Sequence, residues 1–69
     1  MPEVMTPLRL SLLRWVAKHP DRTRDQILAL KGVHPDDLAF LEQHDLVRER
    51  APGGYRISRL GEMALQRSL

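Results

Sequence analysis

The sequence predicts one small α+β domain built from three helices, a two-stranded β-hairpin and a closing helix. Three observations predict it. The chain has 69 residues, which is the length of a single domain covering residues 1–69. Helical patterns of apolar residues fill the first two thirds, and two short alternating runs around glycines follow. Because a lone two-stranded hairpin is barely stable in water, we expect this one to pack on the helices.

The first helix is predicted to begin at Thr6-Pro7 and to end at His19-Pro20. Threonine is a good N-cap, and proline suits the first helical position because its missing N–H costs nothing there. The residue before a proline is pushed out of the helical region, which ends the helix. Apolar residues at spacings of three and four predict a broad buried face made of Leu8, Leu10, Leu12, Leu13, Trp15 and Val16.

A second helix is predicted to begin at Thr23 and to end at Gly32. Gln26 stands three residues after Thr23, which fits a capping box, and glycine fits a left-handed helix end. The apolar face is supplied by Ile27, Leu28 and Leu30. A helix this short needs tertiary packing in order to exist.

A third helix is predicted to begin at Pro35, with His34 near its cap, and to end near His44-Asp45. Its first turn carries two carboxylates, which favour the positive end of the helix dipole. These acids are Asp36 and Asp37, and the core stripe is Leu38 and Leu41.

The hairpin is predicted from a strand at residues 46–50, a turn at 51–54 and a strand at 55–57. The two glycines of the turn are able to take positive φ. Alternation places Tyr55 and Ile57 on one face of the second strand and Arg56 on the other. Ser58 caps a last helix from Arg59 to about Ser68, whose inner side is expected to comprise Leu60, Met63, Ala64 and Leu65.

Two stretches of this sequence resemble winged helix-turn-helix domains of bacterial, archaeal and phage transcription regulators. Residues 41–48 are similar to that superfamily's "LE, two residues, GLV, basic" run. Residues 54–65 resemble its "YRLT, two residues, G, then AL" run, in which the chain leaves the wing. The resemblance covers roughly residues 6–66 and implies a three-helix core with a hairpin wing. Asp45 stands where the superfamily usually has glycine, and aspartate tolerates the left-handed conformation better than most residues.

The charge of the chain is polarised along the sequence, although the formal net charge is only +2. Residues 1–31 carry six basic and three acidic groups, or +3. Residues 34–45 carry four acids and no lysine or arginine, or −4. Residues 48–59 carry four arginines and one glutamate, or +3, and residues 60–69 balance. The predicted hairpin is therefore basic and the predicted third helix is acidic.

The resemblance implies double-stranded DNA as the partner and transcription regulation as the role. Wing arginines are expected to hold phosphates or enter the minor groove, unless they only keep a solvated hairpin soluble. Two arginines at the start of the second helix either meet a phosphate or pair locally with Asp21 and Asp25. Asp36 and Asp37 at the front of the third helix repel phosphates, so we expect weak sequence selectivity. The predicted DNA-binding residues are Arg22, Arg24, Gln43, His44, Arg48, Arg50, Arg56 and Arg59.

The acidic third helix supports an alternative function, in which the winged helix binds a protein partner through Asp36, Asp37 and Phe40. Phe40 stands one position off the core stripe. It either completes the core against the first helix or forms an exposed anchor. The sequence leaves the choice between monomer and homodimer open; for a homodimer, the expected surfaces are the first and last helices with Leu10, Met63 and Leu69. Trp15 is expected in the core or at a subunit interface.

Several function classes have no support in the sequence. There is no cysteine, and the three histidines are too far apart for a recognised zinc pattern, so we expect no metal. There is no phosphate loop, no dinucleotide fingerprint and no nucleophile tied to a base, so we expect no cofactor and no enzymatic activity. No apolar run approaches the ~18 residues of a membrane span and no signal peptide is visible, so we expect a cytoplasmic protein without membrane contact.

Overall fold

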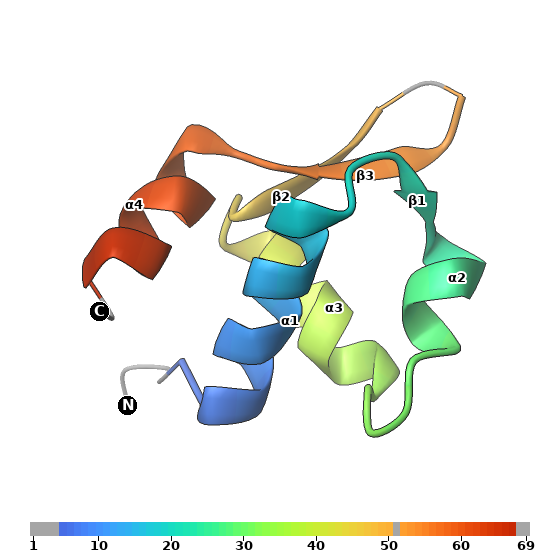
Figure 1. Ribbon diagram of the computed structural model, residues 1–69, viewed down its shortest axis with the longest axis horizontal. Coiled ribbons are helices and arrows are strands. Elements are labelled where there is room, and N and C mark those ends of the chain that lie inside the picture. Colours follow the sequence, from blue (N-terminus) through green and yellow to red (C-terminus); the bar gives the residue numbers. More distant parts are fainter. Residues whose placement is uncertain (1–4, 51, 68–69) are drawn as a thin grey trace.

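Four helices and one three-stranded antiparallel sheet make up the part of the chain that the structure, a computed structural model, describes: residues 5–50 and 52–67 (Figure 1). In chain order the elements are α1 (Pro7–Lys18), β1 (Arg22–Thr23), α2 (Arg24–Leu28), α3 (Pro35–Gln43), β2 (Val47–Arg50), β3 (Gly54–Ile57) and α4 (Arg59–Arg67). The α+β class is therefore confirmed. No helix among these residues is long and apolar enough to cross a membrane.

The helix starts follow the capping residues. The Thr6 hydroxyl accepts a hydrogen bond from the Arg9 amide at 3.2 Å, and Pro7 begins α1. Thr23 and Gln26 form the predicted capping box, with bonds of 3.2 and 2.9 Å. Each bond satisfies an amide that has no partner inside the helix. The Ser58 hydroxyl likewise accepts from the Gly61 amide at 3.0 Å and begins α4.

The predicted end of the second helix at Gly32 is wrong. α2 ends at Leu28, and Ala29 follows as its cap in a right-handed conformation. Successive tight turns then take over, because the Leu30 amide bonds to the Ile27 carbonyl at 3.1 Å and the Val33 amide to the Leu30 carbonyl at 3.2 Å. In these turns Leu30 and Val33 pack against the core. Gly32 does take positive φ, at 85°, but within this turn region.

The sheet has the order β1-β3-β2, so β3 is central and β2 is an edge strand. The predicted two-stranded hairpin is thus part of a larger sheet, because the short strand β1 pairs with β3. Two residues are too few to display the alternation that identifies a strand in a sequence. Gly54 permits this pairing, since a Cβ there would lie 2.6 Å from the Asp21 Cα. Gly53, with φ of 127°, supplies the turn.

The core lies between α1, α3 and the inner face of the sheet (Figure 1). The predicted stripe of the third helix is confirmed, because Leu38 and Leu41 are fully buried. Phe40 is also core, at 7% exposure. The remaining buried hydrophobic residues are Leu12, Leu13, Val16, Ile27, Val47 and Tyr55. Leu8, predicted in the α1 stripe, is 46% exposed because it lies in the first turn, at the rim of the core.

Two of the four residues predicted to line the inner side of the last helix are in fact exposed. Leu60 and Met63 are 50% and 43% exposed. α4 instead turns Gly61 toward the sheet, where it is buried, and Ala64 and Leu65 pack against the core. A Cβ on Gly61 would collide with the Leu46 carbonyl oxygen and lie 2.6 Å from Ile57 Cγ1. The close approach of backbone at Gly61 therefore sets the rotation of the helix.

Candidate nucleic-acid interface

Arginines gather on the outer face of the β2–β3 hairpin. In the antiparallel register Arg48 lies opposite Arg56, and Arg50 lies opposite Gly54. Residues opposite one another share a face, so these three side chains point away from the core. All three are exposed, whereas Val47 and Tyr55 on the other face are buried. The alternation predicted for Tyr55, Arg56 and Ile57 is therefore confirmed.

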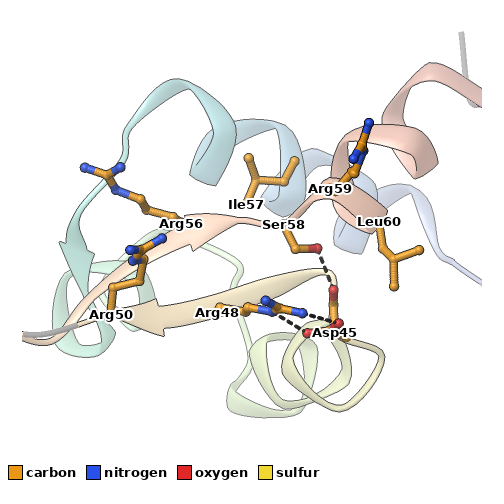
Figure 2. A pocket seen from close by; sticks show the side chains of 8 residues that line it. All are labelled: Asp45, Arg48, Arg50, Arg56, Ile57, Ser58, Arg59 and Leu60. Atoms are coloured by element: carbon orange, nitrogen blue, oxygen red, sulfur yellow. Dashed lines mark hydrogen bonds and ion pairs between the residues drawn. The ribbon is translucent and has the colours of Figure 1, made fainter.

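An open hollow of about 440 Å³ connects this face to the beginning of α4. Figure 2 shows Arg50 and Arg56 projecting from the two neighbouring strands, with Arg59 on the far side of Ser58. The sequence stretch of 12 residues from 48 to 59 thus folds back on itself and brings four arginines to one surface. We call Arg48, Arg50, Arg56 and Arg59 the arginine face.

Two of these arginines are already held by aspartates. Arg48 donates from Nε and Nη2 to the Asp45 carboxylate at 2.7 and 2.8 Å, as the dashed lines in Figure 2 mark. Arg56 donates in the same way to Asp21, with both distances 2.8 Å. The guanidinium hydrogen bonds hold the pKa of both carboxyls below the usual range and raise the pKa of both arginines. Each pair carries no net charge at neutral pH.

Both aspartates adopt a left-handed backbone conformation. The φ of Asp21 is 65° and that of Asp45 is 57°, and they are the two described non-glycine residues with positive φ. The φ of Asp45 confirms the expectation that aspartate tolerates the left-handed conformation at this position. Each residue turns the chain directly before or near a strand, and its side chain then reaches the outer face of the sheet. Each aspartate thus both turns the backbone and forms the ion pair with its arginine.

The other two members of the arginine face are unpaired. Arg50 and Arg59 are exposed and form no ion pair with any acid in residues 5–50 and 52–67. A guanidinium carries five N–H donors, and a cation without a carboxylate partner attracts anions from solution. Arg50 and Arg59 are therefore the two arginines beside the hollow that no carboxylate bonds, and Arg50 still acts at longer range on Asp21, whose pKa it helps to lower.

The structure places Arg22 and Arg24 apart from the arginine face. Arg22 lies opposite Tyr55 in the register, so it shares the inner face of the sheet, although it is exposed at the edge. Arg24 donates from Nη1 to Glu42 Oε1 at 3.2 Å. Contact with Tyr55 is the largest of the effects that raise the pKa of Arg24. The local pairing expected with Asp21 and Asp25 is wrong for Arg24, and Asp21 pairs with Arg56 instead.

Gln43 and His44 also lie outside the hollow. Gln43 is exposed at the last turn of α3 and borders a separate depression with Asp36. The His44 ring stacks on Phe40 with centroids 4.1 Å apart, and its Nδ1 lies 3.0 Å from the Phe40 carbonyl oxygen. Of the eight predicted DNA-binding residues, only the four of the arginine face are brought together.

Two of the three residues predicted for the protein-binding surface on α3 are buried. Asp37 is 8% exposed, accepts from Arg9 Nε at 3.1 Å and accepts from the His34 amide at 3.1 Å. The Arg9 guanidinium also lies 4.2 Å from the centre of the Phe40 ring, which is itself buried. The exposed-anchor interpretation of Phe40 is therefore wrong, and only Asp36 faces solvent. These groups join α1 to α3.

The predicted dimer surfaces are present only in part. Met63 is exposed, together with Leu60, beside an open groove of about 570 Å³ between α4 and the end of α3. Leu10 is half-buried, and Trp15 is half-buried against the core. Leu69 lies outside the described residues.

Sequence reasoning missed the roles of Asp21 and Asp45. Asp45 stands three residues before Arg48, which is a spacing that brings charges together across a turn, so a signal was present. Asp21 and Arg56 are separated by 35 residues, and only the unpredicted pairing of β1 with β3 brings them together.

Comparison with protein-family models, curated proteins and solved structures gives no match for this chain. Among the residues that the structure describes, no three His, Asp or Glu side chains converge in a geometry that holds a metal ion. Of the surfaces described above, the arginine face is the one on which four arginines lie together.

Proposed function

We propose that this chain is a small winged-helix protein that binds double-stranded DNA through the arginine face, as a transcriptional regulator or accessory factor. The order of three helices, a hairpin and a closing helix supports the winged-helix assignment. In this proposal the β2–β3 hairpin is the wing. It contacts the sugar-phosphate backbone, which fixes the position of a protein on a duplex without reading the sequence.

The observation that carries the proposal is the pair of arginines beside the hollow that no carboxylate bonds. Arg50 projects from β2 and Arg59 from the start of α4, and both are exposed. Phosphates of a duplex repeat at short intervals, so cations on two neighbouring elements match a polyanion better than a single small anion. The glycines at the hairpin tip, Gly53 and Gly54, carry no side chain and let a duplex approach the backbone closely.

The exposed carboxylate on the front of α3 limits which bases this surface reads. Asp36 is exposed in the first turn of α3, where a winged helix presents residues to base edges. A carboxylate accepts only from a cytosine amino group and repels phosphates. The proposal is therefore binding governed by backbone contacts, with low sequence selectivity for one copy of the domain.

The test is a salt series of fluorescence anisotropy with a generic labelled duplex. The two arginines without an ion pair, each at a phosphate, predict a slope of log K against log salt of about −1.8. Arg50→Glu removes one contact and adds a repulsive charge, so the slope becomes shallower by about 0.9 and the affinity at ~0.1 M salt falls by roughly tenfold or more.

The matched control is Lys31→Glu, which changes the net charge equally in the loop between α2 and α3, away from the arginine face. We expect it to bind nearly as well as the parent chain. A folded chain without binding at low salt overturns the proposal, as does an equal loss in both variants.

A further inference from the structure

We propose that Asp21 and Asp45 restrain the sequence-independent attraction of the arginine face for DNA, by holding Arg56 and Arg48 as neutral pairs. This inference rests on the proposed function and concerns the same surface. It makes the two aspartates determinants of selectivity, although neither is expected to contact DNA.

The geometry of the pairs carries the first step. Both contacts are bidentate, run through Nε and Nη2 of the guanidinium, and are no longer than 2.8 Å. Such fork-to-fork contacts are the strongest and most directional ion pairs in proteins. Of the five N–H donors of each guanidinium, three remain unused by the aspartate. Arg48 and Arg56 thus keep the capacity to donate hydrogen bonds while their charge is cancelled.

The register of the sheet carries the second step. Arg48 and Arg56 lie directly opposite one another on β2 and β3. Like charges in that position repel. The two carboxylates stand at opposite ends of this arginine pair, one before β1 and one before β2, and each neutralises the arginine beside it. The hairpin therefore tolerates two opposed arginines without presenting two free cations.

The backbone carries the third step. Both aspartates take positive φ, a conformation in which glycine is least strained and asparagine is as well tolerated as aspartate. The turn alone thus has no requirement for a carboxylate. What the carboxylate adds at each position is the bidentate ion pair.

The consequence for DNA binding follows from counterion release. A cation that neutralises a phosphate adds about 0.9 to the magnitude of the salt slope. An arginine already neutralised by a carboxylate adds nothing to this sequence-independent term. Its remaining N–H groups contribute only where an acceptor meets them in the correct geometry. Arg50 and Arg59 then supply the sequence-independent attraction to phosphates. Arg48 and Arg56 contribute only through hydrogen bonds to DNA acceptors that lie in the correct geometry.

The test uses Asp21→Asn, Asp45→Asn and the double variant with the generic duplex and salt series described above. Asparagine keeps the left-handed backbone and removes only the charge. Each freed arginine steepens the slope by about 0.9, which at ~0.1 M salt is a gain in affinity of roughly eightfold, or about sixtyfold for the double variant. Far-UV circular dichroism and a thermal melt check that every variant is folded.

Two controls separate this effect from a general change in charge. Asp25→Asn makes the same change of charge in the first turn of α2, at an exposed residue that does not line the hollow. It is expected to leave the slope unchanged. Asp21→Asn in an Arg56→Gln background is expected to give a much smaller gain, since Arg56 is absent and only the weaker attraction between Asp21 and Arg50 is lost.

The outcomes distinguish this inference from the proposed function. A parent chain that binds DNA, with folded Asp21 and Asp45 variants that bind equally or more weakly, overturns the inference and leaves the proposed function standing. A gain of undiminished size without Arg56 overturns it as well. If neither the parent nor the double variant binds duplex at low salt, both proposals fail together.

Discussion

Gly61→Ala is expected to destabilise the protein by roughly 2–3 kcal/mol, which is the usual cost of forcing an extra methyl group into a packed site. The new Cβ would collide with the Leu46 carbonyl oxygen, which is backbone and has little freedom to move, and with Ile57. α4 would have to lift away from the sheet, and with it Arg59 at its first turn. Urea denaturation followed by circular dichroism measures the change in the free energy of unfolding.

The direction of the change in the free energy of unfolding tests whether Gly61 is packed as described. In an exposed helix, replacing glycine by alanine stabilises by about 1 kcal/mol, because alanine is the better helix former. Gly32→Ala is the control, since nothing lies within 4 Å of its Cβ position and only its φ of 85° opposes the change. That strain costs about 1–2 kcal/mol. A more stable Gly61→Ala protein would contradict the packing of α4 described above.

Leu41→Ala is expected to cost about 2–5 kcal/mol, the range for truncating a buried leucine. Leu41 is fully buried on α3, and its carbonyl accepts the Leu46 amide at 2.9 Å where the chain turns toward β2. At ~0.05–0.15 kcal/mol per residue, a chain of 69 residues has a total stability of roughly 3–10 kcal/mol. The substitution therefore removes a large part of that stability and lowers the midpoint of thermal unfolding by many degrees.

Leu60→Ala is the companion measurement for the core. Leu60 has the same side chain, but it is 50% exposed on α4. Surface changes of this kind usually stay within about 0.5 kcal/mol. If the two leucine variants lost equal stability, the assignment of Leu41 to the core and Leu60 to the surface would be wrong.

The α-helical part of the fold is largely predictable from local signals. Thr6, Thr23 and Ser58 each provide a side-chain oxygen where a helix needs one, and each begins a helix as expected. Pro20 stops α1 through sterics that act between adjacent residues. Such signals act within a few residues, so a sequence displays them without tertiary structure.

The parts that escape prediction depend on contacts between distant segments. β1 is a strand only because β3 offers it a partner, and a two-residue segment has no pattern of its own. The rotation of α4 follows from the close contact of Gly61 with Leu46, so a count of apolar residues misplaces Leu60 and Met63. α2 gives way to tight turns after Leu28, and these turns pack Leu30 and Val33 against the core.

Some features of the candidate site are also predictable from local sequence, whereas others depend on distant segments. The segment charge of +3 over residues 48–59 predicts a basic hairpin, and the register does place its arginines on one face. Which arginines are neutralised is set by Asp21, from a segment 35 residues away, and by Asp45 at a turn. Net charge is a property of the sequence, whereas the charge presented to a partner is a property of the fold.

The edge position of β2 has a consequence for the aggregation behaviour of this protein. An edge strand has unsatisfied backbone groups on its open side and recruits strands from other molecules unless something opposes it. Three of the four residues of β2 are charged, namely Arg48, Glu49 and Arg50, and a second molecule pairing there would meet them at close range. Arginines on this strand thus oppose edge-to-edge polymerisation whether or not DNA is present, and a variant that makes the strand neutral forfeits that protection.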